Sequence, residues 1–194
     1  VSLEELLNRL RHLSWGAADI LLAYSRGDQP PYGFPKALNV NEDGDGPVSA
    51  ADLAVNTWLL EGLNSSFPLA NWTLISEETA KGKVLLELPG SNDWIWILDP
   101  LDGTKDFLQG TGEYAVHLAL VSCNTPSLGI VLLPELEELW IGIVGVGAWC
   151  EDRMGKNISV RFSERNDLSE MILVASRNHR DERLEKLIKS LQLG

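Results

Sequence analysis

Short apolar segments recur at regular spacing from residue 72 onward, and they constrain the fold more than any other feature of the chain. Turn-forming residues separate these segments, which cover residues 72–76, 93–99, 114–122, 128–133, 139–144, 147–151 and 158–161. Runs of this length and spacing are typical of β-strands, and their short connections favour a mostly antiparallel sheet. Because such a sheet has apolar residues on both faces, a helical layer must cover one of them.

Two helices are predicted ahead of the strands. Ser2 and Glu5 match a capping box, and leucines then recur at helical spacing toward Leu21. A second helix is predicted to begin at Ser49. Its apolar side contains Leu53, Trp58, Leu59 and Leu63. We expect both helices to pack against the sheet and to supply the layer that it requires.

The order of these elements predicts one domain and the beginning of another. Residues 27–47 are rich in Gly, Pro, Asn and Asp without a sustained period, which predicts a long loop. An apolar segment at 171–176 and a charged helical pattern at 180–191 look like the start of a parallel-sheet unit. We therefore predict an α+β fold, a layered α-β sandwich in which two N-terminal helices cover a mostly antiparallel sheet. The N-terminal domain would span 1–165, and 166–194 would hold the first strand and helix of a truncated C-terminal α/β domain.

The composition excludes several classes of partner. With 16 basic and 28 acidic residues the formal net charge is −12, so nucleic-acid polymers and anionic membranes would be repelled by most of the surface. No apolar run approaches the roughly 20 residues that a membrane span requires. Cys123 and Cys150 lie in apolar strand-like segments, which predicts reduced core cysteines of an intracellular, cytoplasmic protein.

The segment WILDPLDGTKDF at residues 96–107 places an acidic turn directly after an apolar strand. We expect the strand to end at Asp99, after which Pro100 directs the chain into a turn that contains Asp102. Two carboxylates held close together repel each other unless a cation lies between them, and oxygen-only ligands suit Mg²⁺. The carbonyl of Leu101 is a further candidate ligand. An ordinary Asp-rich turn is the alternative.

A short helix is predicted directly after this turn, over the residues TKDFL. The backbone amides of Gly103, Thr104 and Lys105 would form its N-terminus, where the helix dipole favours a phosphate oxygen. The positive charge of Lys105 opposes that dipole, and a bound phosphate would offset the conflict. An exposed lysine in an Asp-rich turn is the alternative explanation.

Two further acidic residues are candidates for the same site. The strand at 72–76 runs directly into Glu77, and neighbouring strand ends would bring Glu77 and Asp99 together. For Glu77 the alternative is the solvated start of a loop. Asp52 is the second candidate, although Ser49 and Asp52 also match a helix capping box that alone could explain this aspartate.

Three segments, in this order, resemble the lithium-sensitive, metal-dependent phosphomonoesterases of the inositol monophosphatase superfamily. They are PVSAAD at 47–52, LISEE at 74–78 and WILDPLDGTKDF at 96–107. The DGTKDF motif followed by GEYAVHLALV at 112–121 looks like the 3'(2'),5'-bisphosphate nucleotidase branch of that superfamily. The later ASRNHRDE at 175–182 is similar to a Ser-Arg-Ser-His segment of the bacterial nucleotidases.

The resemblance implies a role for each matching residue. The implied Mg²⁺ ligands are Glu77, Asp99, Asp102 and the carbonyl of Leu101, with two or three ions expected in a complete enzyme. Thr104, assisted by Glu77 and Asp52, would orient a water molecule for in-line attack on phosphorus. The implied phosphate- and substrate-binding residues are Gly103, Thr104, Lys105, Ser176 and His179. For His179, an ordinary residue of a surface loop is the alternative.

The implied function is a Mg²⁺-dependent phosphatase that removes the 3'-phosphate of adenosine 3',5'-bisphosphate, with the sulfated precursor of that nucleotide as a further substrate. Its partner would be this small nucleotide, in the cytoplasm, with a homodimer left open. An inositol monophosphatase-like or fructose-1,6-bisphosphatase-like sugar phosphatase is the first alternative. The family draws another metal-binding Asp from a Trp-Asp-x-Ala-Ala-Gly segment, which does not occur before Gly194. An inactive truncated fragment of such an enzyme is therefore the second alternative.

Overall fold

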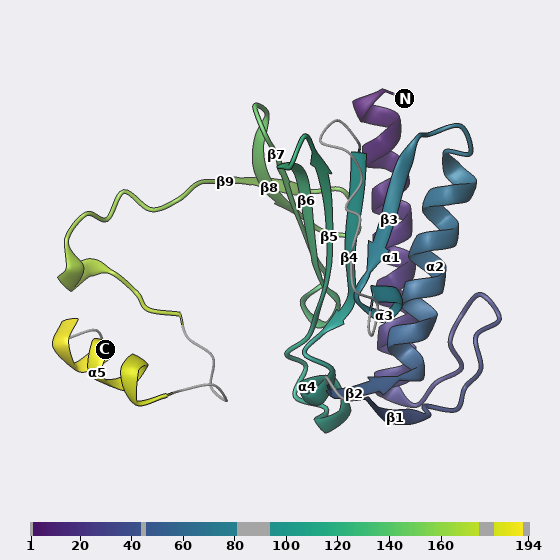
Figure 1. The fold of residues 1–194 in the computed structure, drawn as a ribbon, viewed down its shortest axis with the longest axis horizontal. Helices are drawn as coiled ribbons and strands as arrows, with labels where there is room; N and C mark the ends of the chain where they lie inside the picture. Colours follow the sequence, from purple (N-terminus) through teal and green to yellow (C-terminus); the bar gives the residue numbers. More distant parts are fainter. Residues whose placement is uncertain (1, 44–45, 81–93, 175–180, 192–194) are drawn as a thin grey trace. The chain divides into compact units, whose positions relative to one another are not determined.

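The computed structural model describes residues 2–43, 46–80, 94–174 and 181–191 of the chain. It divides into two compact units, the first ending at Val160 and the second beginning at Arg161. The first unit contains the sheet and the helices that cover it (Figure 1).

The first helix, α1 (Leu3–Arg26), begins and ends where its capping residues predict. The hydroxyl of Ser2 accepts a hydrogen bond from the backbone N–H of Glu5 at 3.1 Å, which satisfies one of the unpaired donors of the first turn. Gly27 closes the helix in the left-handed conformation, with φ 71°. The expected capping residue is therefore confirmed.

The second helix, α2 (Ala50–Ser66), begins with the predicted capping box between Ser49 and Asp52. The predicted loop before it is partly wrong, because β1 (Val40–Asp43) and β2 (Gly46–Ser49) pair there as an antiparallel hairpin. The sequence of this hairpin is polar and rich in Gly, so it carries no alternating apolar signal.

The main sheet has seven strands in the order β3-β4-β5-β6-β7-β8-β9. Their bounds are β3 (Trp72–Ser76), β4 (Trp94–Asp102), β5 (Ala115–Ser122), β6 (Thr125–Leu133), β7 (Glu138–Ile143), β8 (Gly147–Glu151) and β9 (Asn157–Val160). β3 and β4 run parallel, and the other neighbouring strands run antiparallel. Short helices follow β3, β4 and β6, namely α3 (Glu77–Ala80), α4 (Thr104–Gln109) and η1 (Pro134–Leu136). The predicted mostly antiparallel sheet is confirmed.

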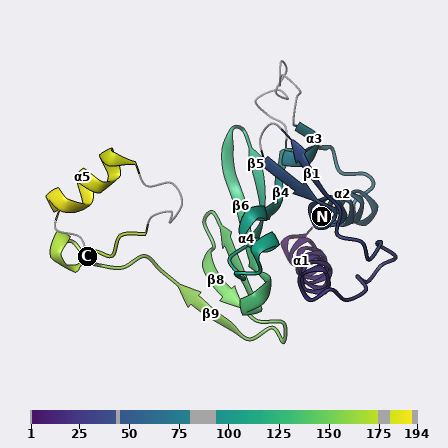
Figure 2. The same cartoon turned by 90° about the horizontal axis from the view of Figure 1, so that it is seen from below.

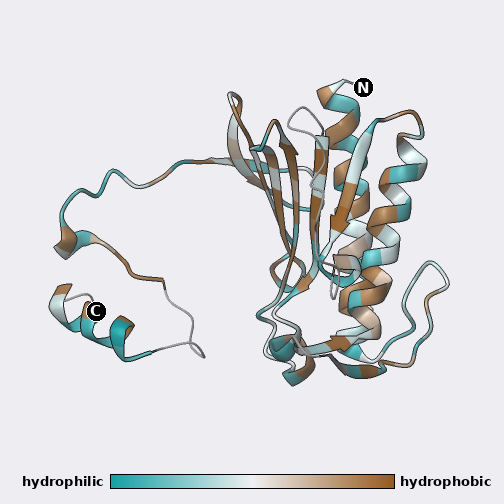
Figure 3. Ribbon diagram, in the orientation of Figure 1, coloured by the Kyte–Doolittle hydropathy of each residue, from teal (hydrophilic) through white to brown (hydrophobic). Residues whose placement is uncertain are grey.

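The hydrophobic core lies between this sheet and the two long helices, which share one of its faces (Figure 2). The largest fully buried side chains include Leu10, Ile20, Leu21, Val55, Leu59, Leu63, Trp96, Leu98, Leu132, Leu139 and Ile141. Figure 3 shows hydrophobic residues along the strands and along one side of each long helix. Leu53, which we expected on the apolar side of α2, is 46% exposed, because Ala51, Ala54 and Val55 occupy the buried side instead.

A partly buried ion pair joins α1 to β8, next to the edge strand β9. Arg11 donates to both carboxylate oxygens of Glu151, at 2.6 and 3.1 Å, and Trp149 Nε1 donates to Glu151 Oε2 at 3.1 Å. The Glu151 carboxylate is thus fully engaged although this residue is only 2% exposed. This ion pair attaches the helical layer to the sheet through polar as well as apolar contacts.

The second unit contains η2 (Leu168–Glu170) and α5 (Glu182–Leu191). The predicted helix at 180–191 is confirmed over α5. The predicted strand at 171–176 is wrong over 171–174, which have no strand partner, and its last two residues lie outside the described ranges. The assignment of 166–194 to the start of a second α/β domain stays a prediction.

The two cysteines are free thiols, but the prediction of two core cysteines is wrong, because Cys123 is exposed and Cys150 is only partly buried. Cys123 and Asn124 form the exposed turn between β5 and β6, with φ values of 51° and 59°. Two consecutive residues with positive φ are typical of the tight turn that matches the twist of a hairpin. In the described part of the chain, no helix has the length and apolar character of a membrane span.

Candidate metal and phosphate site

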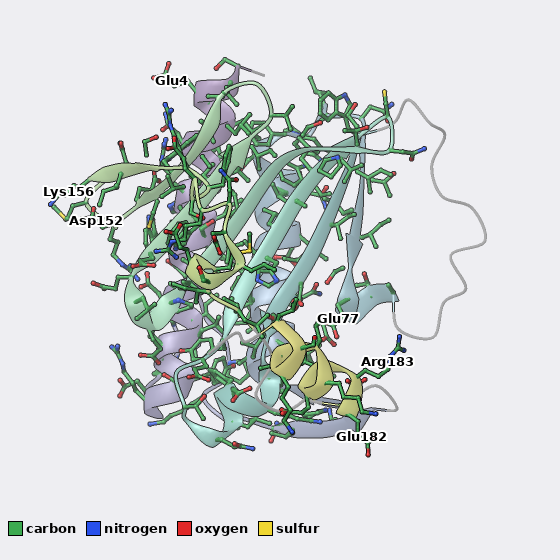
Figure 4. The ribbon with its side chains drawn as sticks, turned by 90° about the vertical axis from the view of Figure 1, so that its left-hand side faces the viewer. Glu4, Glu77, Asp152, Lys156, Glu182 and Arg183 are labelled. Atoms are coloured by element: carbon green, nitrogen blue, oxygen red, sulfur yellow. The ribbon has the colours of Figure 1, made fainter. Side chains whose placement is uncertain are left out.

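The parallel pairing of β3 with β4 brings two acidic residues together. Ser76 pairs with Leu98, so the residues that follow them, Glu77 and Asp99, lie side by side at the same end of β3 and of this pairing. Figure 4 labels Glu77 at this end of β3, where α3 begins. The register of β3 and β4 therefore explains the expected approach of Glu77 to Asp99.

β4 does not end at Asp99 as expected, because it continues through an irregularity to Asp102. Asp99 pairs with His117 and Asp102 pairs with Ala115, so β4 uses one residue more than β5 between these pairs. Such a bulge re-aims the side chains around it and leaves a place for proline, which cannot donate to a ladder. The bulge keeps both aspartates on an ordered strand instead of in a loose turn.

Gly103 is required by the sharp bend between β4 and α4. Its φ is 86°, in the left-handed region. A Cβ atom at this position would lie 2.8 Å from the carbonyl oxygen of Glu113. Behind the bend, the rings of Phe107 and Tyr114 meet edge to face with centroids 4.9 Å apart. The predicted helix after Gly103 is confirmed as α4, and close packing fixes the position of its first turn.

Thr104 connects this turn to α2. Its hydroxyl lies 3.0 Å from the carbonyl oxygen of Leu101 and 3.1 Å from Asp52 Oδ1, so its one proton is shared between two acceptors. Asp52 is 2% exposed, and its other carboxylate oxygen accepts hydrogen bonds from the N–H and the hydroxyl of Ser49. Burial raises the pKa of Asp52, whereas the hydrogen bonds from Ser49 and Thr104 lower it. Asp52 therefore caps α2 and also positions Thr104.

Asp99 is the electrostatically strained member of the site. Burial, followed by the negative charges of Glu77 and Asp102 and a hydrogen bond with Glu77, raises the pKa of Asp99 to about 7. A hydrogen bond from the Leu101 N–H to Asp99 Oδ1, at 3.2 Å, opposes that shift. Carboxylates that raise one another's pKa in this way are stabilised by a cation.

The donor atoms match a hard divalent cation, although they do not yet enclose one. Glu77, Asp99, Asp102 and the Leu101 carbonyl supply only oxygen, which is the ligand chemistry of Mg²⁺. Within the described ranges, no three Asp, Glu, His or Cys side chains are already arranged to hold one metal ion. Glu77 already contacts Asp99, and the residues Glu77 and Asp102 are both exposed to solvent.

The structure gives less information on the predicted substrate-binding residues Lys105, Ser176 and His179. Lys105 is exposed on the first turn of α4. Asp102 also lines a cavity of about 910 Å³ together with Arg26, Tyr114 and Glu135. Ser176 and His179 lie outside the described residues, so their predicted place near a nucleotide stays a prediction.

Sequence reasoning missed several polar side chains that support the site. Ser76 donates to Asn56 Oδ1 at 2.6 Å, and Tyr114 donates to Glu135 at 2.8 Å. The spacing of Asn56, four residues after Asp52, could have indicated that both lie on one face of α2. The partner on β3 could not have been identified from spacing.

Comparisons with known proteins show the family of this chain. The model of the inositol monophosphatase family matches residues 2–193. The chain belongs to this family. It is 32% identical over 187 residues to the 3'(2'),5'-bisphosphate nucleotidase CysQ of Escherichia coli (strain K12), a match that covers 96% of this chain and 69% of CysQ. The predicted resemblance to a phosphatase of this branch is therefore confirmed.

Two solved structures share the fold. CysQ from Bacteroides thetaiotaomicron, at 24% identity, has a TM-score of 0.64 over 95% of this chain and 68% of its own. SuhB from Bartonella henselae, at 26% identity, has a TM-score of 0.65 over 84% of this chain and 56% of its own. The chain thus spans between about half and two thirds of the length of these proteins.

Proposed function

We propose that this chain carries the metal- and phosphate-binding part of a Mg²⁺-dependent phosphatase that removes the 3'-phosphate of adenosine 3',5'-bisphosphate. The observation that carries the proposal is that Glu77 and Asp99 meet at the same end of the β3–β4 pairing, near the Thr104–Asp52 hydrogen bond. The 32% identity to CysQ supports the nucleotide as substrate. The sulfated precursor of the nucleotide, with the same 3'-phosphate, would be a second substrate.

Glu77, Asp99, Asp102 and the carbonyl of Leu101 would hold the metal. A bound divalent cation supplies charge neutralisation at phosphoryl oxygens and makes water more acidic. The protein's contribution is to hold mutually repelling carboxylates in place, which the bulge of β4 and the hydrogen bond from the Leu101 N–H achieve. The raised pKa of Asp99 supports this assignment, because a cation would relieve the repulsion that raises it.

Thr104 would orient the attacking water. When its hydroxyl donates to Asp52, its oxygen keeps lone pairs that can accept a hydrogen bond from water. Asp52 is buried and fixed by Ser49, so it helps to hold the threonine oxygen in place before substrate binds. Such positioning lowers the entropy cost of bringing water and phosphorus together.

The amides of Gly103 and Thr104 would bind oxygens of the 3'-phosphate, because the first N–H groups of a helix are directed outward at its beginning. Lys105 is exposed beside them and would attract the second phosphate of the nucleotide. This second contact distinguishes a bisphosphate from a simple phosphomonoester. Ser176 and His179 are proposed to lie near the nucleotide on the basis of the sequence resemblance alone.

Phosphate release by the purified 194-residue chain tests this function. Adenosine 3',5'-bisphosphate, inositol 1-phosphate and fructose 1,6-bisphosphate are compared with Mg²⁺, with EDTA and with added Li⁺. We expect Mg²⁺-dependent, Li⁺-inhibited release, fastest from the nucleotide. Preference for one of the sugar phosphates would replace the proposed substrate with the inositol- or fructose-type alternative. Mg²⁺ binding without turnover of any of them would support the inactive-fragment alternative.

A further inference from the structure

A buried hydrogen bond joins the middle of α2 to the last residue of β3. The Ser76 hydroxyl donates to Asn56 Oδ1 at 2.6 Å. Ser76 is fully buried and Asn56 is 9% exposed, so neither polar group can exchange its partner for bulk water at low cost. A short hydrogen bond in this environment fixes both residues.

Asn56 lies one helical turn after Asp52, so the two side chains share one face of α2. Asp52 accepts from Thr104, which follows β4, whereas Asn56 accepts from Ser76, which ends β3. One helix face therefore holds the ends of both strands that carry the acidic residues. The chain places these partners far apart in sequence, and α2 sets their distance in space.

Ser76 is also tied to the residues that follow it. Its backbone N–H donates to Thr79 Oγ1 at 3.3 Å, and the Thr79 hydroxyl lies 3.1 Å from the carbonyl oxygen of Ser76. These contacts start α3, whose first residue is Glu77. Glu77 thus lies between a side-chain anchor on α2 and a closed turn, and its Cα has little freedom although its carboxylate is exposed.

From this arrangement we propose that Asn56 is a positioning residue for Glu77 and acts through the hydroxyl of Ser76. The proposal rests on the assignment of Glu77 as a metal ligand in the proposed function. Its physical basis is that a ligand on a flexible side chain binds well only when its backbone is held within a fraction of an ångström. Asn56 therefore matters for metal affinity and not only for packing.

A purely structural role of this hydrogen bond predicts a different result. If Asn56 only satisfied a buried hydroxyl, its loss would lower stability and leave the metal affinity of the folded chain unchanged. Metal affinity is thus the decisive measurement, and thermal unfolding in EDTA is the parallel readout of stability. Binding of Mg²⁺ alone is measured by calorimetry on the folded 194-residue chain.

The variants are Ser76→Ala, which removes the donor, and Asn56→Ala, which removes the acceptor. Because one net hydrogen bond is worth a factor of about three to ten in an equilibrium constant, each should raise the Kd for Mg²⁺ by about that factor. The Kd of the double variant for Mg²⁺ should be no higher than that of the single variant with the higher Kd, since both substitutions remove the same hydrogen bond. Ser65→Ala is the matched control, because it removes a serine hydroxyl bonded to Gly62 at the far end of the same helix.

Glu77→Gln separates this inference from the function on which it rests. Loss of Mg²⁺ affinity in Glu77→Gln but not in the variants of Ser76 and Asn56 overturns the positioning role alone. An unchanged Kd in Glu77→Gln overturns the ligand assignment itself. Weakening by Ser65→Ala to the same degree also overturns the positioning role. Should one variant of the pair fail to fold, the other decides, because donor and acceptor are removed separately.

Discussion

Thr104 Oγ1 lies 3.1 Å from Asp52 Oδ1, although 52 positions separate these residues in the chain. The contact joins the first turn of α4 to the first turn of α2. It gives one aspartate two duties, since Asp52 both caps a helix and holds a candidate catalytic hydroxyl. The helix-capping role of Asp52 and its proposed role in positioning Thr104 are therefore compatible.

Thr104→Ala should lower kcat for phosphate release by about 10²- to 10⁴-fold, the usual loss when a group that orients or moves a proton is removed. Thr104→Ser keeps the hydroxyl and should retain most of the activity. Thr111→Ala is the control, because it removes a threonine that bonds Asp106 at the exposed end of α4. Equal activity of Thr104→Ala and the parent chain would show that this hydroxyl does not take part.

Asp99→Asn should abolish Mg²⁺ binding and stabilise the metal-free chain at pH 8. The folded-state pKa of Asp99 is raised to about 7, mainly by burial and by Glu77. In the unfolded chain this aspartate has its ordinary pKa of roughly 4. Between about pH 4 and pH 7 the folded chain therefore keeps a proton that the unfolded chain has released. The free energy of unfolding must therefore fall as pH rises through this window.

Urea unfolding in EDTA at pH 5 and pH 8 measures that pH dependence. We expect the parent chain to lose stability between these values and Asp99→Asn to lose less. Added Mg²⁺ should restore the parent chain at pH 8 and leave the variant unchanged. A parent chain that gains stability with rising pH would contradict the assignment of the raised pKa to Asp99.

Lys105→Thr should raise KM for adenosine 3',5'-bisphosphate more than for a simple phosphomonoester, because only the bisphosphate offers a second anionic group. Lys156→Thr, at the turn before β9, is the control for a general loss of positive charge (Figure 4). Equal effects of Lys105→Thr on both substrates would remove this lysine from the choice of substrate.

Gly103→Ala should destabilise the chain by more than Gly110→Ala, as measured by the midpoint of thermal unfolding. Both glycines have positive φ, at 86° and 69°, so both variants carry the strain of about 1 kcal/mol that a side chain adds in the left-handed region. At Gly103 the new Cβ would also meet the Glu113 carbonyl oxygen at 2.8 Å, whereas at Gly110 it meets nothing within 4 Å. Equal losses would show that the bend can relax.

Much of the fold could be predicted because the spacing of apolar residues and the positions of turn-forming residues can be read from short stretches of sequence. Two strands have their predicted bounds, at 72–76 and 147–151. The hairpin before α2 was missed because its strands are polar. The strand predicted at 171–176 failed over 171–174, because these residues have no strand partner in the described part of the chain. Cys123 was misplaced because it lies one residue beyond the strand predicted at 114–122, in the tight turn between β5 and β6.

The candidate site could be predicted in its residue types and in the approach of Glu77 to Asp99, but not in its detailed geometry. The charges in WILDPLDGTKDF indicated where acids gather, and the motif indicated which chemistry they suit. The register that sets Glu77 beside Asp99 and the bulge before Asp102 depend on strand pairing, which leaves no local trace in the sequence. The bond between Ser76 and Asn56 is hidden for the same reason.

The parallel pairing of β3 and β4 also has a consequence for the order of folding. Antiparallel neighbours can form from a hairpin, whereas a parallel pair needs a longer crossover and closes a larger loop. Glu77 and Asp99 can therefore meet only when the β3–β4 pair closes, and not when the neighbouring hairpins form. The repulsion between their charges is thus a cost of this one pairing, and a bound cation would lower that cost.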